Sequence, residues 1–187
     1  LNNVAGNFIR VSKVGNPELK PQSSTNLNFG IIYLNGDRKF SLDYWQIDYK
    51  DRLTVESAAT LYNADSNNSI FTYNNGVLFA ANIKYINEEK TDLSGLDFSF
   101  ESEKFDSSLG QFDYKINGTY LMKYETTQLG TSIERAGRFN HDIEGYSLPE
   151  YKVNLFAVME KNLNKYTFNA RYVSGYDNYK TLFSRAI

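Results

Sequence analysis

His141 is the only histidine of the chain and the residue with the clearest potential for metal binding. Asp142 and Glu144 follow it closely, and one imidazole with two carboxylates could hold a divalent ion. The chain supplies no second histidine and no cysteine to complete a common transition-metal site. We therefore expect a solvated polar loop here, and we predict neither a metal site nor a bound cofactor.

Two carboxylate pairs could supply a general acid and a general base, namely Glu88 with Glu89 and Asp48 with Asp51. Both pairs fall on or next to segments with the alternating pattern of strands, where acidic side chains would line a polar surface. The sequence contains no glycine-rich phosphate loop. These features predict that the chain is not an enzyme.

The composition favours strands of an unusual kind. Aromatic residues make up 16% of the chain, with 15 Tyr and 13 Phe, and such side chains fit a pleated, half-buried surface. The mean hydropathy of -0.51 argues against a helical membrane protein, but a transmembrane barrel needs lipid-facing residues only at alternate strand positions. The net charge of -2 gives no excess of positive charge of the kind that binds nucleic acid.

The segment from Phe112 to Glu125 decides the fold class. Its alternate positions are apolar or aromatic, and the positions between them are polar except for Leu121. The first set is Phe112, Tyr114, Ile116, Gly118, Tyr120, Met122 and Tyr124. A period of two predicts a strand with one apolar and one polar face. This strand exceeds the roughly 5–6 residues typical of globular proteins and reaches the roughly 9–11 that cross a bilayer.

The same alternation predicts about six main strands, at residues 24–34, 39–53, 81–104, 110–125, 150–160 and 164–176. Two points stay open. Residues 77–83 either extend the third strand or form a separate short hairpin. The change of phase after Tyr44 reflects either a β-bulge or the end of an aromatic girdle.

Short and long connections alternate along the chain. The connections near residues 34–39, 101–111 and 160–165 are short, whereas long polar loops lie near 54–77 and 126–150. Short turns at one end and long loops at the other are typical of outer-membrane barrels. Six strands are too few to close such a barrel, and unpaired edges are untenable in lipid. We therefore expect residues 1–187 to form an all-β, antiparallel up-and-down meander that is an open, incomplete part of a transmembrane β-barrel.

The loops offer the only candidate ligand contacts. Aromatic rings stack on sugar or chelate rings, and guanidinium groups pair with carboxylates or phosphates. Six loop residues could therefore meet a solute at the barrel mouth, although loop residues more often solvate the chain and pack on each other. They are Tyr62, Phe71 and Tyr73 in the first long loop, and Arg135, Arg138 and His141 in the second.

Several motifs, in order, resemble the C-terminal half of TonB-dependent receptors. NPELKPQSSTNLNFGIIY (16–33) is similar to an external loop leading into a descending strand, with Gln22 where glutamate is usual. FSLDYWQIDYKDRL (40–53) is similar to the ascending strand after it. YINEEKTDLSGLDFSFESE (85–103), LGQFDYKINGTYLMKYE (109–125), SLPEYKVNLFAVME and FNARYVSGYDN resemble the hairpins that follow.

The resemblance implies a section of a bacterial outer-membrane transporter that imports a nutrient such as a siderophore, a vitamin or a saccharide. It also implies contact with outer-membrane lipid and, in a complete receptor, a plug domain and TonB as partners. Two alternatives remain from the residues themselves: a porin or small complete barrel, and a soluble all-β carbohydrate-binding module. A soluble sandwich would bury the aromatic faces against a second sheet, whereas a barrel leaves them as a continuous outer belt.

Overall fold

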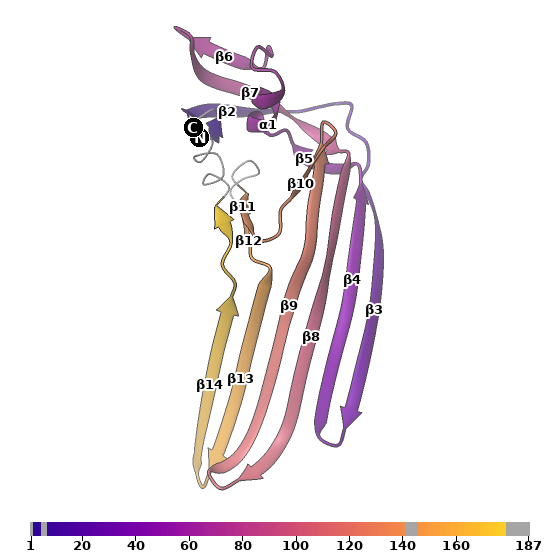
Figure 1. Ribbon diagram of the computed structural model, residues 1–187, viewed down its shortest axis with the longest axis vertical. Helices are drawn as coiled ribbons and strands as arrows, with labels where there is room; N and C mark the ends of the chain where they lie inside the picture. The colour runs from indigo at the N-terminus through magenta and orange to yellow at the C-terminus, as the bar shows by residue number, and fades with distance from the viewer. Residues whose placement is uncertain (1, 5–6, 141–145, 179–187) are drawn as a thin grey trace.

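The computed structural model describes residues 2–4, 7–140 and 146–178, and nearly all of them lie in antiparallel strands (Figure 1). The one helix among these residues is α1 (Ala58–Ala64), capped at its N-terminus by Ser57, whose side chain accepts a hydrogen bond from the Thr60 amide. Within the described part of the chain, no helix is long and apolar enough to cross a membrane. The predicted fold class is confirmed.

A large sheet of long strands forms the body of the structure (Figure 1). Six strands follow the order β14-β13-β9-β8-β4-β3, and the short β10 also pairs with β9. Among the described residues, β3 and β14 form the two edges and do not pair with each other, so the sheet is open. Its strands are β3 (Ser23–Asn35), β4 (Arg38–Lys50), β8 (Lys90–Ser107), β9 (Gly110–Gln128), β10 (Thr131–Glu134), β13 (Tyr151–Lys161) and β14 (Asn164–Val173).

Two of the predicted strands are wrong at the ends that carry the long connections. The predicted strand 39–53 breaks at Asp51, which adopts a φ of 53°, and the next residues form β5 (Arg52–Val55) in another sheet. The predicted strand 81–104 is two strands, β7 (Val77–Glu88) and β8, which belong to different sheets. Residues 77–83 therefore begin β7, where they form a hairpin with β6 (Phe71–Asn74).

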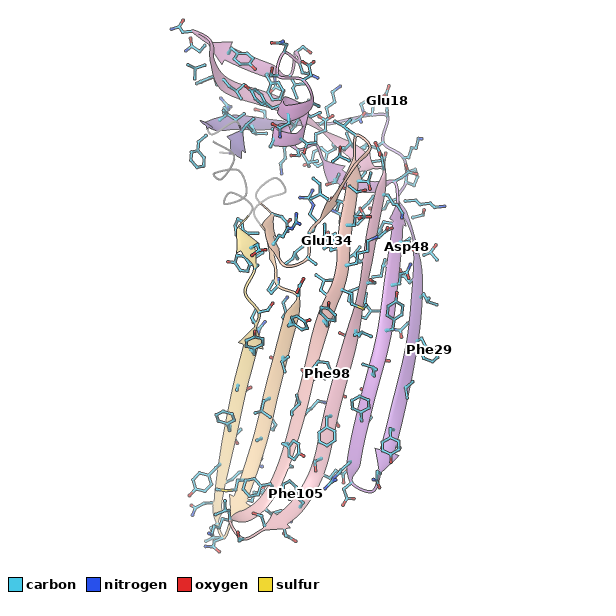
Figure 2. The ribbon with its side chains drawn as sticks, viewed as in Figure 1. Glu18, Phe29, Asp48, Phe98, Phe105 and Glu134 are labelled. Atoms are coloured by element: carbon cyan, nitrogen blue, oxygen red, sulfur yellow. The ribbon has the colours of Figure 1, made fainter. Side chains whose placement is uncertain are left out.

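The register of the large sheet separates an apolar face from a polar face. Cross-strand rows such as Leu42–Phe98–Gly118–Val153–Tyr172 place apolar residues of successive strands side by side. Figure 2 shows Phe29 and Phe98 at mid-height of the sheet and Phe105 near its turns. The apolar face comprises Leu27, Phe29, Ile31, Tyr33, Phe40, Leu42, Tyr44, Leu96, Phe98, Phe100, Phe112, Tyr114, Ile116, Gly118, Tyr120, Tyr151, Val153, Leu155, Ala157, Met159, Tyr166, Phe168, Ala170 and Tyr172.

This apolar face is uncovered by other parts of the described chain. Phe29 is 66% exposed and Phe168 is 58% exposed, values that no packed core residue would have. From Tyr151 to Met159 the face runs about 26 Å along the strand, from the usual rise of roughly 3.3 Å per residue. Ring pairs mark both limits, with Tyr120 stacked on Tyr151 at 4.4 Å and Phe105 on Phe112 at 5.8 Å.

The opposite face is lined by polar side chains that pair across strands. Ser41 and Ser99 share a hydrogen bond of 2.8 Å, and the Thr119 hydroxyl donates to Asp97 at 2.6 Å. Farther toward the turns, the Lys115 ammonium lies 2.5 Å from the Glu101 carboxylate. Period-two strands with these two faces are what the sequence predicted.

One β-bulge changes the phase of β9. The register with β8 shifts between Ser94 and Gly95, because Leu121 pairs with Gly95 and Lys123 pairs with Ser94. Met122 is the extra residue, so every side chain beyond it changes face. The prediction that Tyr124 continues the apolar face is therefore wrong.

The second open point concerned β4, which keeps an unbroken register with both neighbours. The bulge considered near Tyr44 is absent from the described register. The apolar face ends at Tyr44 instead, and Trp45 lies on the polar face, against Gly95. A Cβ at Gly95 would lie only 2.4 Å from the Trp45 ring, so glycine is what lets the indole lie flat on the strand.

The predicted first long loop contributes α1 and β6 to a small sheet that has its own core (Figure 1). β1 (Asn2–Val4), β2 (Asn7–Val14), β7 and β5 are neighbours in that order, and β6 pairs with β7. β2 is parallel to β7, an association that adjacent sequence could not indicate. Its buried core is Val4, Ile9, Ala58, Phe71, Leu78, Ala81 and Ile83.

The second long connection contains β10 and part of a three-stranded sheet. That sheet consists of β11 (Arg138–Asn140), β12 (Tyr146–Leu148) and β15 (Asp177–Asn178), with β11 in the middle. β15 is parallel to β11. Both predicted long loops thus carry folded structure at the same end of the large sheet (Figure 1).

We expect Gly118→Ala to destabilise the large sheet. An added Cβ would lie 2.6 Å from the Phe98 ring and 2.8 Å from the Lys152 carbonyl oxygen, which the strand ladder holds in place. Overpacking of this kind costs about 1–3 kcal/mol. Urea unfolding in detergent micelles measures the difference. Gly15→Ala is the control because no atom lies within 4 Å of its Cβ. Equal stability of the two variants would contradict the β8–β9–β13 register.

Candidate functional site

The three ligand candidates of the first connection lie together in the small sheet, and two of them are used in its packing. Phe71 is 7% exposed, and its ring meets that of Tyr62 edge-on at 5.4 Å. Tyr73 is 40% exposed, and its hydroxyl donates to the carbonyl of Ser66. As placed here, Tyr62 and Phe71 support the fold of the connection, while Tyr73 remains accessible. A ligand contact at these residues stays a prediction.

The candidates of the second connection lie elsewhere. Arg135 is 5% exposed, and its Nε donates to the Thr126 hydroxyl at 2.9 Å, which fastens β10 and its following turn to β9. Arg138 is half-buried in β11. His141 lies outside the described residues. The structure therefore does not gather Arg135 and Arg138 with the first three candidates, and contact of any of these residues with a solute stays a prediction.

The carboxylate of Glu134 joins the end of β9 to the turn that follows β10. Glu134 Oε1 accepts hydrogen bonds from the backbone amides of Tyr124, Arg135 and Ala136, at 2.9, 3.0 and 2.9 Å. Three backbone donors around one carboxylate oxygen fix both the side chain and the turn. Figure 2 places Glu134 at the upper end of the large sheet, beside the strand ends.

A polar cluster that the sequence did not indicate joins the small sheet to the large one. Arg52 Nη1 donates to the Tyr124 hydroxyl at 2.7 Å, and its Nε lies 3.4 Å from Glu88 Oε2. The Thr91 hydroxyl donates to the same Glu88 oxygen at 2.6 Å. Glu88 is 4% exposed and Thr91 is 0% exposed, so this cluster is buried. A buried carboxylate needs such partners.

The geometry of this cluster follows from the two chain breaks. Arg52 comes directly after Asp51, and Glu88 is the last residue of β7, so both stand where the chain passes from one sheet to the other. Tyr124 reaches them because the bulge at Met122 turns it onto the polar face. The sequence did not indicate the contact between Arg52 and Tyr124, because an unbroken period of two places Tyr124 on the apolar face.

An aromatic patch on the polar face adjoins this cluster. Register rows align Trp45 with Gly95 and Leu121, Ile47 with Leu93 and Tyr124, and Tyr49 with Thr91 and Thr126. The Arg52 guanidinium lies 5.9 Å from the centre of the Tyr124 ring. We name Trp45, Ile47, Tyr49, Leu93, Leu121, Tyr124 and Arg52 the mouth patch. Aromatic rings can stack on a planar solute, while the Arg52 charge is already paired with Glu88.

The apolar face ends in a different, charged network at the same height. Asp48, Asp92 and Glu125 form one cross-strand row, and the ammonium of Lys123 contacts both Asp92 and Glu125 at 3.2 Å. Lys90 contacts Asp92 at 2.6 Å. Like charges opposite each other destabilise a sheet, and these lysines offset that repulsion.

The electrostatics of Asp92 and Lys123 agree with this arrangement. Burial by itself would raise the pKa of Asp92, but hydrogen bonds from Lys90 and Lys123 outweigh it and lower the pKa below its usual value. Burial would likewise lower the pKa of Lys123, but Glu125 and Asp92 raise it above its usual value. Both residues lie beyond the last aromatic row of the apolar face, so a sharp polar boundary follows the aromatic one.

Within the described residues, no group of three or more histidine or acidic side chains is placed to hold a metal ion. The carboxylate pair Glu88 and Glu89 has structural partners. Glu88 bonds to Arg52 and Thr91, and Glu89 accepts from the Gly130 amide at 3.2 Å.

We expect Arg52→Gln to destabilise the junction of the two sheets. The change leaves the buried Glu88 with only the Thr91 hydroxyl, and loss of one partner of a buried ion pair costs up to about 3 kcal/mol. Hydrogen exchange should become faster in β5 and β7, and the double variant Arg52→Gln/Glu88→Gln should recover part of the loss. Lys50→Gln, an exposed lysine two residues earlier, serves as the control. Equal exchange in Arg52→Gln and Lys50→Gln would contradict the role of this cluster.

Comparisons with known proteins assign this architecture to a family. Residues 2–184 match the family described as TonB dependent receptor-like, beta-barrel. The siderophore receptor PirA from Acinetobacter baumannii is 18% identical with a TM-score of 0.52, over 88% of this chain and 22% of that receptor. A mutant of the ferric enterobactin receptor PfeA from Pseudomonas aeruginosa is 15% identical with a TM-score of 0.51, over 83% of this chain and 19% of the receptor.

A search of curated proteins finds no significant match. The chain spans about a fifth of the length of the two solved receptors, 22% and 19%. The family match covers almost all of this chain, and its order of hairpins is the one that the sequence motifs resemble. This chain belongs to the family of TonB-dependent receptor β-barrels.

Proposed function

We propose that this chain is a section of an outer-membrane receptor that imports a nutrient in a TonB-dependent way. The uncovered apolar face carries the proposal, because a belt of aromatic and aliphatic residues about 25 Å tall is what a barrel presents to lipid. In this proposal the apolar face contacts outer-membrane lipid, the polar face lines the lumen, and the two folded connections lie outside the cell.

The two limits of the belt support this orientation. Stacked Tyr120 and Tyr151 stand at one limit, and the row with Asp48, Asp92 and Glu125 lies just beyond it. Aromatic residues favour the interface between hydrocarbon and head groups, and the charged row then lies in water or among head groups. Membership of the family also speaks against the porin and the soluble carbohydrate-binding module.

The solute that we propose is a ferric chelate of the siderophore class. The mouth patch presents the rings of Trp45, Tyr49 and Tyr124, and such rings favour a solute with planar groups on which they can stack. The two similar receptors are named as a siderophore receptor and a ferric enterobactin receptor, which supports the same solute class. In the full receptor, a plug domain would occupy the lumen and TonB would supply energy from the periplasm. The chain would act as a transporter wall and not as an enzyme.

Lipid contact of the apolar face can be tested with two neighbouring residues of β14. Ala170 lies on the apolar face opposite Leu155, whereas Asn169 lies on the polar face opposite Phe156. We expect Ala170→Lys to cost about 2–4 kcal/mol in lipid vesicles, the usual cost of a lysine at mid-depth on the lipid side, and Asn169→Lys to cost little. Urea-dependent folding into vesicles measures both. A larger loss for Asn169→Lys would reverse the assigned faces and overturn the proposal.

Import is tested with the complete receptor gene in its host. We expect deletion of the receptor gene and deletion of tonB each to abolish uptake of one iron-labelled siderophore from a panel, and the restored gene to recover it. Trp45→Ala should raise the siderophore concentration for half-maximal uptake roughly fivefold, since one stacking contact is worth about 1 kcal/mol. Asn169→Ala, on the same face away from the mouth patch, is the control at matched receptor levels. Uptake of the whole panel that is independent of the receptor would refute the function.

A further inference from the structure

The polar face carries two kinds of cation. Lys104 and Lys165 both contact Glu160, at 2.8 and 3.2 Å, and Lys115 contacts Glu101 at 2.5 Å. These three lysines lie toward the turns and are neutralised by carboxylates of neighbouring strands. They stabilise the wall and leave little charge to attract another anion.

Lys152 and Arg171 differ from them. Both are exposed, and no carboxylate of the described residues forms an ion pair with either. Lys152 stands opposite Val173 and Arg171 stands opposite Asn154, so the two cations are diagonal neighbours on the same face of β13 and β14. Diagonal neighbours on a sheet lie about 7–8 Å apart, close enough for two long side chains to contact one ligand.

The surroundings of these two cations are amides and hydroxyls, with one carboxylate on the far side of the hollow. They line an open hollow of about 340 Å³ together with Asp97, Asn117, Thr119 and Asn154. One oxygen of Asp97 accepts the Thr119 hydroxyl, and the Asn154 amide donates to Asn117 at 3.1 Å. Thr119 separates Asp97 from Lys152 in the same cross-strand row. The hollow thus presents an ammonium and a guanidinium beside amides and hydroxyls on the β13–β14 side, and the Asp97 carboxylate lies across Thr119 on the other side.

The position along the wall adds a second reason. The row that contains Asp43, Asp97, Thr119 and Lys152 comes next after the row of Trp45, Gly95 and Leu121, on the side of the turns. A solute that leaves the mouth patch and moves along the polar face would therefore meet Lys152 and Arg171 next. A guanidinium fork and an ammonium match the oxygens of a carboxylate or a phosphate.

We propose that Lys152 and Arg171 form an anion-binding site on the wall, which takes a carboxylate or phosphate group of the solute as it passes from the mouth patch. This inference rests on the proposed function, because it assumes that solute moves along the polar face. The same chemistry could come from an acidic side chain elsewhere in the full receptor, and the experiment separates these two sources.

The test measures how fast an amine-reactive ester acylates Lys152 in the complete receptor in detergent, read by mass spectrometry of its peptides. Inorganic phosphate is the probe and sodium chloride of equal ionic strength is the reference. At about ten times its dissociation constant, phosphate should slow the reaction roughly tenfold, because only the unbound fraction reacts. Lys39, an exposed lysine on the same face near the turns, should react at the same rate in both salts.

The variant Arg171→Gln identifies the site. Loss of phosphate protection at Lys152 in this variant supports one site made by both cations, filled by a free anion. A second outcome is that Lys152 is acylated slowly without phosphate and rapidly in the Arg171→Gln variant. A carboxylate of the receptor itself then fills the site, and the proposal that the solute is its ligand is overturned. Equal rates at Lys152 and Lys39 in all conditions, with no effect of Arg171→Gln, overturn the anion site.

Import in the host separates this inference from the function on which it rests. Siderophore uptake that persists while phosphate gives no protection removes the anion site and leaves the transporter. Protection by phosphate in a receptor that imports nothing from the panel keeps an anion site but removes its role in transport, and the inference is then overturned. If the site serves transport, Arg171→Gln should lower uptake several-fold, and Asn169→Ala should not.

Discussion

The structure depends on one constraint, which is that strands with alternating side chains keep all their rings on the same face of the sheet in only one register. A slip of one residue would move a whole set of rings to the opposite face. The ladders β3–β4 and β4–β8 keep one register along their full length, so two chemically different faces extend across the sheet. The apolar belt and the polar wall are therefore two results of the same pairing.

The β8–β9 ladder shifts its register at two places, between Ser102 and Phe105 near the turns and at the bulge of Met122 near the other end. Beyond this bulge Tyr124 turns to the polar face and bonds to Arg52, while Lys123 turns to the other face and contacts Asp92. One extra residue thus ends the apolar face on β9 and serves two polar networks, one on each side of the sheet. Bulges often re-aim side chains at the rim of a barrel, and this one joins the wall to the connections above it.

The sequence predicted the parts whose structure is local. Long strands, their faces and their short turns follow from a period of two and from turn residues such as Gly36, which adopts a φ of 56°. The small sheet could not be predicted in this way, because β2 pairs with β7 across a long stretch of chain and in parallel. The candidate site could not be predicted for the same reason. Residue type alone does not show that Phe71 lies in the core of the small sheet, or that Arg52 contacts Tyr124.

The two sheets draw their stability from different sources. In the described residues, the apolar cluster that contains Ile9, Phe71 and Ile83 belongs to the small sheet, so burial of apolar surface away from water stabilises that sheet. The large sheet keeps its rings exposed, as the 66% exposure of Phe29 indicates, so its backbone ladders are not backed by a core of the same kind. Its apolar face can contribute to stability only when something other than the described chain covers it. The hydrocarbon core of a bilayer has the thickness that matches a belt of that height. In the proposed function, the Arg52 cluster stands at the border between a sheet with a core of its own and a sheet covered by lipid. Its groups need their partners there, because removing one leaves an uncompensated charge away from water.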